Sequence, residues 1–501
     1  MERKEDLHGR MQVQLADRTV PLEIAAEFTL PDYRSEISRL LWVRPTLMPP
    51  ERFIGGGKAE FSGQVFFEAL YTGPDGLLYG AELDTGYSFS VPLDSEIEDP
   101  QLFAIPIADA VISRVSGPRK LSVRCRAHTQ VRGYGEKALS LTLKDAPKDA
   151  TPAQLCDTVQ VGRVIGGGRE EITLTDMLEL EEDVRVICAR GNVFLPDVHA
   201  AEDEVLCRGE VQLTLLLCRE EEDSAPFTLS RCIPFEERVA LEGAQSAHHA
   251  CATGTVGRID YSIENGSLCL SPALTLVAQV QYEEPLTLCR DVFLPACREE
   301  KLTRTEHLWQ NGGCCNRHFT ISCERPLAEF GIGEECEIID LISEAEICEK
   351  TSDGTKHVLS GKLHCHLLCR RGGELCTTDA IFPFRLTPEL GGEQLAVDAH
   401  VCDCRVSIRG TTLRADAELQ LTLCLPIPFV TTFVNEVSFQ AAPARERADV
   451  ELYYPAPGQT LWDVAKHYGI PPEALAELNA LPCDAPDDAH SLAGKSFLLI
   501  P

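Results

Sequence analysis

The chain has 501 residues, of which 44% are hydrophobic and 25% charged, a composition typical of a globular protein with roughly three or four domains. Asp and Glu outnumber Lys and Arg by 78 to 46, and the formal net charge is −32. A field of this sign repels phosphate backbones, so nucleic acid is excluded as an expected partner.

The N-terminal sequence MERKEDLHGRMQVQL has neither an apolar region nor a small-residue cleavage site, so we expect no signal peptide. The best candidate for a membrane span, Leu421 to Val434, is shorter than the roughly 18 residues required and contains Pro426 and Pro428. The sequence therefore predicts no transmembrane segment and a cytoplasmic protein. In a reducing cytosol, the 22 cysteines are expected to be small core residues rather than disulfides.

Three stretches of the chain share one pattern. They begin at Ala59 (AEFSGQVFFEALYTG), Val205 (VLCRGEVQLTLLLCR) and Val358 (VLSGKLHCHLLCRRGG). Each contains a glycine, an apolar strand, a turn, a second strand and an aromatic residue near its end. The glycines, which are about 150 residues apart, mark a repeat the size of a domain rather than of a solenoid unit. They are Gly63, Gly209 and Gly361.

The repeats have the period of β-strands. Leu419–Leu423 and Val211–Leu215 alternate apolar with polar residues, which is typical of strands with one buried face. Asn265-Gly266, Pro74–Gly76 and Gly372-Gly373 are turn signals between such strands. We expect a mainly β fold with three tandem antiparallel domains, at residues 1–145, 146–297 and 298–445.

Neither a metal site nor an active site is expected. Three Cys- and His-containing clusters lack the paired CxxC spacing of zinc sites. They are Cys314-Cys315 with His318, His364–His366 with Cys369, and Cys402–Cys404. The sequence has no GxSxG, HExxH or Walker A motif.

Two glycine-rich segments, Ile54–Lys58 and Gly166–Gly168, lack phosphate-loop spacing, and we expect them to be flexible connections. Carboxylate pairs are too frequent in so acidic a chain to single out a glycosidase pair. The sequence therefore predicts a non-enzymatic protein without catalytic residues, metal or cofactor.

The last part of the chain, residues 448–501, changes character. Thr460 followed by Asp463 forms a capping-box pattern, Gly469 is placed to end that helix, and Pro472 is placed to begin a second helix. Flanking strands are expected at Leu452–Pro455 and Ser496–Ile500, which gives the order βααβ. The first helix should bury one apolar face, consisting of Leu461, Val464, Ala465 and Tyr468.

Two further expectations concern the faces of these helices. Leu475 and Leu478 should direct the second helix inward. Trp462 lies off the apolar face of the first helix, and a Trp at the surface could anchor a protein partner.

From about Leu452 to Pro501 the chain resembles the LysM family. The resemblance implies a shallow glycan-binding groove between the loop before the first helix and the loop after the second. The matching residues here are Gly458, Gln459, Thr460 and Leu461 on one side and Asn479, Leu481 and Pro482 on the other. Each also has a structural interpretation, as a turn, helix cap, core or loop residue.

Two positions in the module depart from the LysM pattern. Gln459 replaces the usual Asp, and Pro455 stands where a β-branched strand residue is usual. The fold tolerates both changes, but they put glycan binding in question.

The three repeats resemble SPOCS domains of sporulation proteins, most clearly at PDYRSEI (Pro31–Ile37) and in the strand around Gly63. Three such domains followed by LysM resemble spore-coat morphogenetic proteins of endospore-forming bacteria. That resemblance implies a scaffold in the mother-cell cytoplasm at the forespore surface. Its implied partners are the basement ATPase of the coat and other coat proteins. The alternative is a protein that binds peptidoglycan or chitin-type glycans.

Overall fold

The computed structural model confirms the mainly β fold, with 78% of the residues in strands and two short α-helices near the C-terminus. Among the residues that it describes, no helix is both long and apolar enough to cross a membrane. The described residues are 2–93, 98–147, 150–180, 183–219, 225–264, 266–352, 357–388, 396–441, 450–482, 492 and 495–501.

The first repeat consists of two facing sheets. In the first sheet the long strand β7 lies between β1 and β6, and in the second β4 pairs with β2, β3 and β5. The strands of the first sheet are β1 (Glu2–Thr29), β6 (Glu98–Gly117) and β7 (Lys120–Lys144). Those of the second are β2 (Arg39–Leu47), β3 (Glu51–Gly55), β4 (Lys58–Thr72) and β5 (Leu78–Pro92).

The second repeat has the same arrangement. Strand β14 lies between β8 and β13 and also pairs with the short β9, while β11 lies between β10 and β12. The first sheet contains β8 (Ala153–Thr173), β9 (Asp176–Glu179), β13 (His249–Glu264) and β14 (Ser267–Phe293). The second contains β10 (Val184–Ala201), β11 (Glu204–Arg219) and β12 (Phe227–Ala240).

The third repeat follows the same plan, with β20 between β15 and β19, and β17 between β16 and β18. Its first sheet contains β15 (Cys297–Pro326), β19 (Ala396–Arg409) and β20 (Thr412–Ala441). A 3₁₀-helix, η1 (Leu327–Phe330), leads to its second sheet, β16 (Glu337–Ser352), β17 (His357–Arg371) and β18 (Glu374–Leu386). In each repeat the first strand therefore pairs with the last, and each repeat has its own apolar core.

The repeated glycines have a common structural role. Each lies directly opposite an aromatic residue in its hairpin: Gly63 opposite Tyr87, Gly209 opposite Phe235 and Gly361 opposite Phe384. A methyl group at Gly63 would lie 2.6 Å from the Tyr87 ring, and one at Gly361 would lie 2.4 Å from the Phe384 ring. In these two hairpins the aromatic ring therefore covers the strand where the side chain is missing. At Gly209 the close neighbour is the Phe194 carbonyl oxygen, 2.1 Å away.

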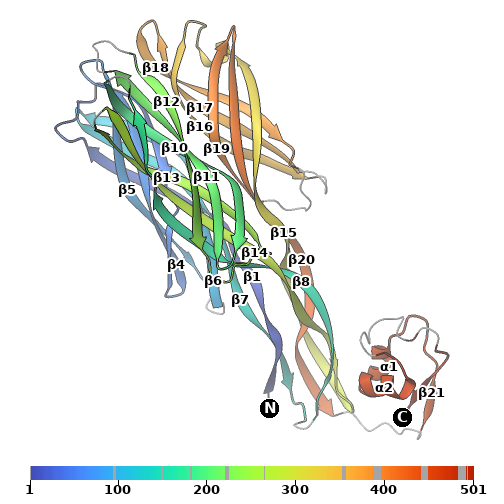
Figure 1. Cartoon of the computed structure of the whole chain (residues 1–501). Helices are drawn as coiled ribbons and strands as arrows, with labels where there is room; N and C mark the ends of the chain where they lie inside the picture. Colours follow the sequence, from blue (N-terminus) through green and yellow to red (C-terminus); the bar gives the residue numbers. More distant parts are fainter. Residues whose placement is uncertain are drawn as a thin grey trace.

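The ends of the six longest strands form what we call the stem: the N-terminal parts of β1, β8 and β15 and the C-terminal parts of β7, β14 and β20 (Figure 1). Two apolar clusters fill it and include Met11, Leu139, Leu286 and Phe433 near its base and Leu143, Val292 and Phe439 farther out. A short parallel pairing of β20 with β7, Glu436–Ser438 against Thr142–Lys144, joins the third repeat to the first. The N-terminus lies at the far end of the stem (Figure 1).

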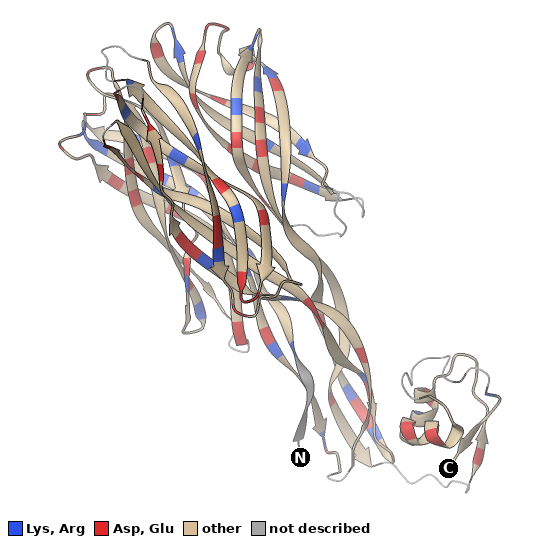
Figure 2. Cartoon of the chain, viewed as in Figure 1, with Lys and Arg blue, Asp and Glu red and all other residues tan. Residues whose placement is uncertain are grey.

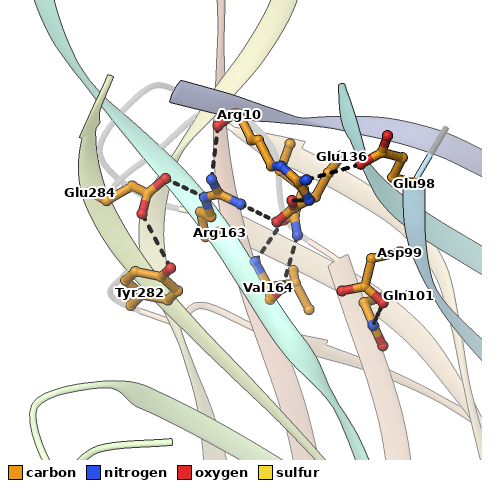
Figure 3. Close-up of polar contacts among 10 residues, drawn as sticks. Arg10, Glu98, Asp99, Gln101, Glu136, Arg163, Val164, Tyr282 and Glu284 are labelled. Carbon is orange, nitrogen blue, oxygen red and sulfur yellow. Dashed lines mark hydrogen bonds and ion pairs between the residues drawn. The ribbon is translucent and has the colours of Figure 1, made fainter. Parts of the chain in front are cut away.

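Polar contacts at the base of the stem join the second repeat to the first (Figure 3). Arg163 on β8 forms ion pairs with Glu136 on β7 and Glu284 on β14, and it donates to the Arg10 carbonyl at 2.8 Å. The buried Gln12 side chain exchanges two hydrogen bonds with the backbone of Val164, at 2.9 and 2.7 Å. This amide therefore replaces a missing strand partner between β1 and β8.

A buried ion cluster joins all three repeats. Arg190 on β10 donates to both carboxylate oxygens of Asp340 on β16 and contacts Glu68 on β4 at 3.1 Å. Burial lowers the pKa of Arg190, but the two carboxylates outweigh it and raise that pKa well above its usual value. The three repeats consequently share a charged core contact.

Charged residues of both signs are interspersed along the strands in the view of Figure 2. Acidic residues mark the two C-terminal helices, where Asp463, Glu473 and Glu477 are exposed. The negative net charge is therefore distributed over the repeats and the C-terminal module.

Most turn predictions agree with the structure, and one does not. Gly76, Gly372 and Gly373 have the positive φ angles of tight hairpin turns, whereas Asn265 lies outside the described residues. The segment Ile54–Lys58 is the tight turn between β3 and β4. Gly166–Gly168 is not a connection but lies inside β8, where a methyl group at Gly167 would be 2.6 Å from the Phe103 ring.

The predicted domain boundaries can be placed relative to the strands, but the division into domains itself stays a prediction. The boundary between 145 and 146 follows β7, and the one between 297 and 298 lies at the first residue of β15. The third boundary, between 445 and 448, lies outside the described residues.

Candidate functional site

The C-terminal module has the predicted βααβ order. Its elements are β21 (Glu451–Tyr453), α1 (Leu461–Tyr468), α2 (Pro472–Asn479) and β22 (Leu498–Ile500), with β21 and β22 antiparallel. The Thr460 hydroxyl accepts the Asp463 N–H at 3.1 Å, and the Asp463 carboxylate accepts the Thr460 N–H at 3.0 Å. Gly469 adopts the left-handed conformation that ends α1.

Both helices pack inward, with one departure from the sequence prediction. Leu475 is buried, but Leu478 is 45% exposed, and Ala476 is the second inward residue of α2. Residues i and i+3 share a helix face only approximately, and in a helix of eight residues this difference turns Leu478 to the surface.

The first side of the expected groove contains exposed and structural residues. Gly458 is exposed with φ of 86°, while Leu461 is completely buried in the module core. Thr460 is half-buried and caps α1. Of the four residues expected on this side, Gly458 is the exposed one, and its left-handed backbone conformation favours glycine.

The second side of the groove follows α2. Pro482 and Ala480 are exposed, and Leu481 is half-buried against the module core. Asn479 is 9% exposed, and its side chain holds α2 to β22: Nδ2 donates to the Leu499 carbonyl at 2.9 Å, and Oδ1 accepts the Leu499 N–H at 2.7 Å. Asn479 therefore stabilises the module, and the exposed part of this wall is Ala480 and Pro482.

The two departures from the LysM pattern are accommodated. The Gln459 Oε1 atom accepts hydrogen bonds from the Ala456 N–H and the Tyr453 hydroxyl, both at 2.8 Å, and so closes the turn before α1. Pro455 lies beyond the end of β21 at Tyr453 and therefore removes no hydrogen bond from the strand pair.

Trp462 is placed differently from the sequence expectation of a Trp at the surface. It is only 4% exposed, because it packs against the tip of the stem. Its ring meets Phe293 edge-on, with centroids 5.0 Å apart, and its indole N–H donates to Asp291 at 2.8 Å. Leu155 of β8 belongs to the same apolar cluster. In this conformation Trp462 binds its own chain.

An ionic network surrounds this contact. Lys466, one turn after Trp462, lies 2.7 Å from the Asp291 carboxylate and 3.4 Å from Glu299, and Lys301 also pairs with Asp291. Burial raises the pKa of Asp291, but hydrogen bonds from Lys301, Lys466 and Trp462 outweigh it and lower the pKa to about 2. We call the contacts of Trp462 and Lys466 with Asp291 and Phe293 the stem latch.

The outer face of the β21–β22 ribbon is apolar and open. Leu452 on β21 and Tyr454 directly after it are exposed, and so is Phe497, which directly precedes β22. The Tyr454 and Phe497 rings are 6.4 Å apart, and Tyr454 is 67% exposed. We call these three residues the apolar strip; none of them was singled out from the sequence.

The His and Cys clusters considered in the sequence have other contacts. His364 pairs with Glu346 and His366 with Asp379, on the exposed side of β17, while Cys365 and Cys369 point into the core. Among the described residues, no group of three or more His, Cys, Asp or Glu side chains has the arrangement of a metal site.

The comparison with protein families identifies the module. Residues 456–486 match the LysM domain. The LysM resemblance is thereby confirmed, and it indicates a module of a type that binds peptidoglycan and related glycans. A search of curated proteins and a search of solved structures found no match. The SPOCS resemblance of the three repeats stays a prediction.

Proposed function

We propose that this protein is a non-enzymatic scaffold whose three β repeats hold a glycan-binding LysM module at the tip of the stem. The ligand class is oligomeric N-acetylglucosamine, as in peptidoglycan or chitin. The observation that carries the proposal is that Gly458, Ala480 and Pro482, on the two groove loops, are exposed although the module is docked. The stem latch uses a different part of α1, so docking and glycan binding are compatible.

The proposal is tested with the full chain and a chitin tetramer by isothermal titration calorimetry. Ala480→Glu places a charged side chain in the groove and should weaken binding at least tenfold. Ala474→Glu, at another exposed position on α2 outside the groove loops, is the matched control and should bind like the parent. Failure of the parent chain to bind both the tetramer and insoluble peptidoglycan would exclude this function.

A second candidate function is the coat scaffold implied by the SPOCS resemblance, in the mother-cell cytoplasm at the forespore surface. The recurrence of the same two-sheet plan in three repeats supports this candidate. In this second function the LysM module docks to the basement ATPase of the coat. The apolar strip suits such a partner, since exposed aromatic and aliphatic residues are enriched in protein interfaces.

A test of ATPase docking needs substitutions at exposed residues. Leu461 and Trp462 are buried, so their substitution by Ala tests the folding and docking of the module rather than a partner surface. Tyr454→Ser and Phe497→Ser change exposed side chains of the apolar strip. The full chain or a variant is immobilised, and retention of the purified coat ATPase is measured. If these variants no longer retain the ATPase but still bind glycan, the second candidate is supported. If both variants retain the ATPase as well as the parent chain does, the apolar strip is not its docking surface.

A further inference from the structure

Two cysteines face each other across the stem. Cys156 on β8 and Cys289 on β14 are directly paired in the antiparallel ladder. Cα atoms of directly opposed antiparallel residues are about 4.5–5.5 Å apart, and disulfides join Cα atoms about 4.4–6.8 Å apart. The backbone therefore already holds the two residues at a separation that a disulfide can bridge.

The two thiols differ in access to solvent. Cys156 is exposed, whereas Cys289 is completely buried. Interaction with the neighbouring Cys289 side chain lowers the pKa of the Cys156 thiol to about 7, against the opposing effects of burial and of the Asp157 carboxylate. The Cys289 thiol also donates to the Asp291 carbonyl at 3.5 Å. Interaction with Cys156 and burial raise the pKa of Cys289. Cys156 can thus react with a reagent as a thiolate, whereas Cys289 stays protonated and buried and is available for the second step.

Direct opposition combined with an exposed thiol distinguishes this pair among the described cysteines. Cys369 and Cys376 are also directly opposed, but Cys376 is half-buried rather than exposed. Cys251, Cys314 and Cys424 form a cluster, but all three are buried. Cys232 and Cys348 are exposed, but Cys232 lies opposite Gln212 and Cys348 lies in a bulge without a direct partner. Burial also raises the pKa of Cys232. These two residues are therefore natural controls.

We propose that Cys156 and Cys289 form a thiol–disulfide couple that exchanges electrons with small-molecule disulfides. The Cys156 thiolate attacks one sulfur of the reagent RSSR, forms a mixed disulfide and releases one thiolate RS⁻. Cys289 loses its proton and attacks the Cys156 sulfur, which forms the Cys156–Cys289 bond and releases a second RS⁻. Two protein thiols are oxidised, and one RSSR is reduced to two RSH, with the protons going to the released thiolates.

The couple lies beside the stem latch. Leu155, the neighbour of Cys156, packs in the apolar cluster with Trp462, and Asp291 lies two residues after Cys289. The disulfide would link β8 and β14, the two strands against which the LysM module packs. Its formation is independent of which ligand that module binds.

Cys156 should react faster with a disulfide reagent than the other exposed cysteines. At pH 7 a thiol of pKa about 7 is about half ionised, whereas a thiol at the ordinary cysteine value of 9.0 is about 1% ionised, a ratio of about 50. Lower basicity reduces nucleophilicity by about eightfold over two pKa units. Burial raises the pKa of Cys232 above this ordinary value, so Cys156 should react at least about sixfold faster than Cys232.

The test uses the full chain, reduced and desalted, with oxidised glutathione at pH 7. Samples are quenched by alkylation, digested and analysed by mass spectrometry. The expected products are glutathionylated Cys156, formed at least about sixfold faster than glutathionylated Cys232, followed by a peptide pair linked through Cys156 and Cys289. Absence of the linked pair, or equal rates at Cys156 and Cys232, overturns the proposal.

Two variants separate the steps. In Cys289→Ala, the mixed disulfide at Cys156 should form more slowly and then accumulate, because the second thiol is absent. Cys156→Ser alters an exposed side chain and should fold normally, with Cys289 remaining a free thiol throughout. Oxidation of Cys289 at the parent rate in Cys156→Ser would show that Cys156 is not the point of entry, which also contradicts the proposal.

Discussion

The buried ion cluster predicts a large effect of a single substitution. Arg190→Met keeps much of the side-chain volume but leaves Asp340, whose side chain is 1% exposed, and Glu68 without their cation. Removing one partner from a buried ion pair costs about 3–5 kcal/mol, because the remaining charge is not solvated. The variant should therefore lose about 3–5 kcal/mol of the free energy of unfolding.

The pH dependence of this loss has a definite sign. Burial raises the pKa of Asp340, while Arg190 opposes this effect, so removal of Arg190 raises that pKa further. A carboxyl with a raised pKa in the folded state takes up protons on folding, and its protonation stabilises the fold. The deficit of Arg190→Met should be full above the raised pKa and should decrease as the pH falls through it.

Guanidinium unfolding followed by tryptophan fluorescence measures the effect, since Trp42 lies 5.9 Å from the Arg190 guanidinium. Adding Asp340→Leu and Glu68→Met to Arg190→Met should restore most of the stability, because an apolar cluster then replaces the charges. Arg325→Met, which breaks a surface pair with Glu329, should cost less than about 1 kcal/mol. If Arg190→Met costs no more than Arg325→Met, the cluster does not hold the repeats together.

Three further predictions test other parts of the molecule. Gly361→Ala should cost about 1–3 kcal/mol in thermal or denaturant unfolding, because the added methyl group meets the Phe384 ring. Thr460→Ala removes the N-cap of α1 and should destabilise the LysM module by about 1 kcal/mol, measured by hydrogen exchange of that helix. Asp291→Asn should open the stem latch and shift the Trp462 emission to longer wavelength. In the parent chain the same shift should occur only as the pH falls from the ordinary Asp range through about 2, since a lowered pKa stabilises the contact above that range.

The sequence predicts the module well because its signals are local. The capping box at Thr460, the left-handed Gly469 and Pro472 at the start of α2 each act within a few residues. The repeat hairpins are predicted for the same reason, since period-two alternation and a glycine turn determine a strand pair with little help from the rest of the chain.

The stem is not predicted, because its strand pairs are not local. Strand β15 pairs with β20 from Cys297 opposite Ala441 to Pro326 opposite Thr412, so most of the third repeat lies between the partners. Alternation indicates that each segment is a strand but carries no information about its partner. The same limit explains why the prediction for Gly166–Gly168 is wrong. The Phe103 ring of the first repeat crowds Gly167, and the Ala240 carbonyl of β12 crowds Gly168, and both neighbours lie far away in the sequence.

The position of Trp462 shows how a candidate site can be misread from one helix. Its place off the apolar face of α1 indicates a second contact surface, and a sequence cannot say whether that surface meets another protein or the same chain. The structure brings Phe293 and Asp291 to it, although they lie far earlier in the sequence. The signal that could have found the contact is Lys466, one turn from Trp462, since an aromatic and a basic residue together suit an acidic, apolar surface.

This intrachain contact determines how ligand experiments on the module must be read. Residues 448–501 alone would expose Trp462 and Lys466, which the full chain covers with Phe293 and Asp291. A protein that binds the isolated module through Trp462 would therefore compete with the stem for this residue in the full chain. Glycan binding at Gly458 and Pro482 has no such competitor, because these residues are exposed in the docked state. A partner bound by the isolated module and by Asp291→Asn, but not by the parent chain, would thus identify the Trp462 face. A ligand bound equally by all three would identify the groove.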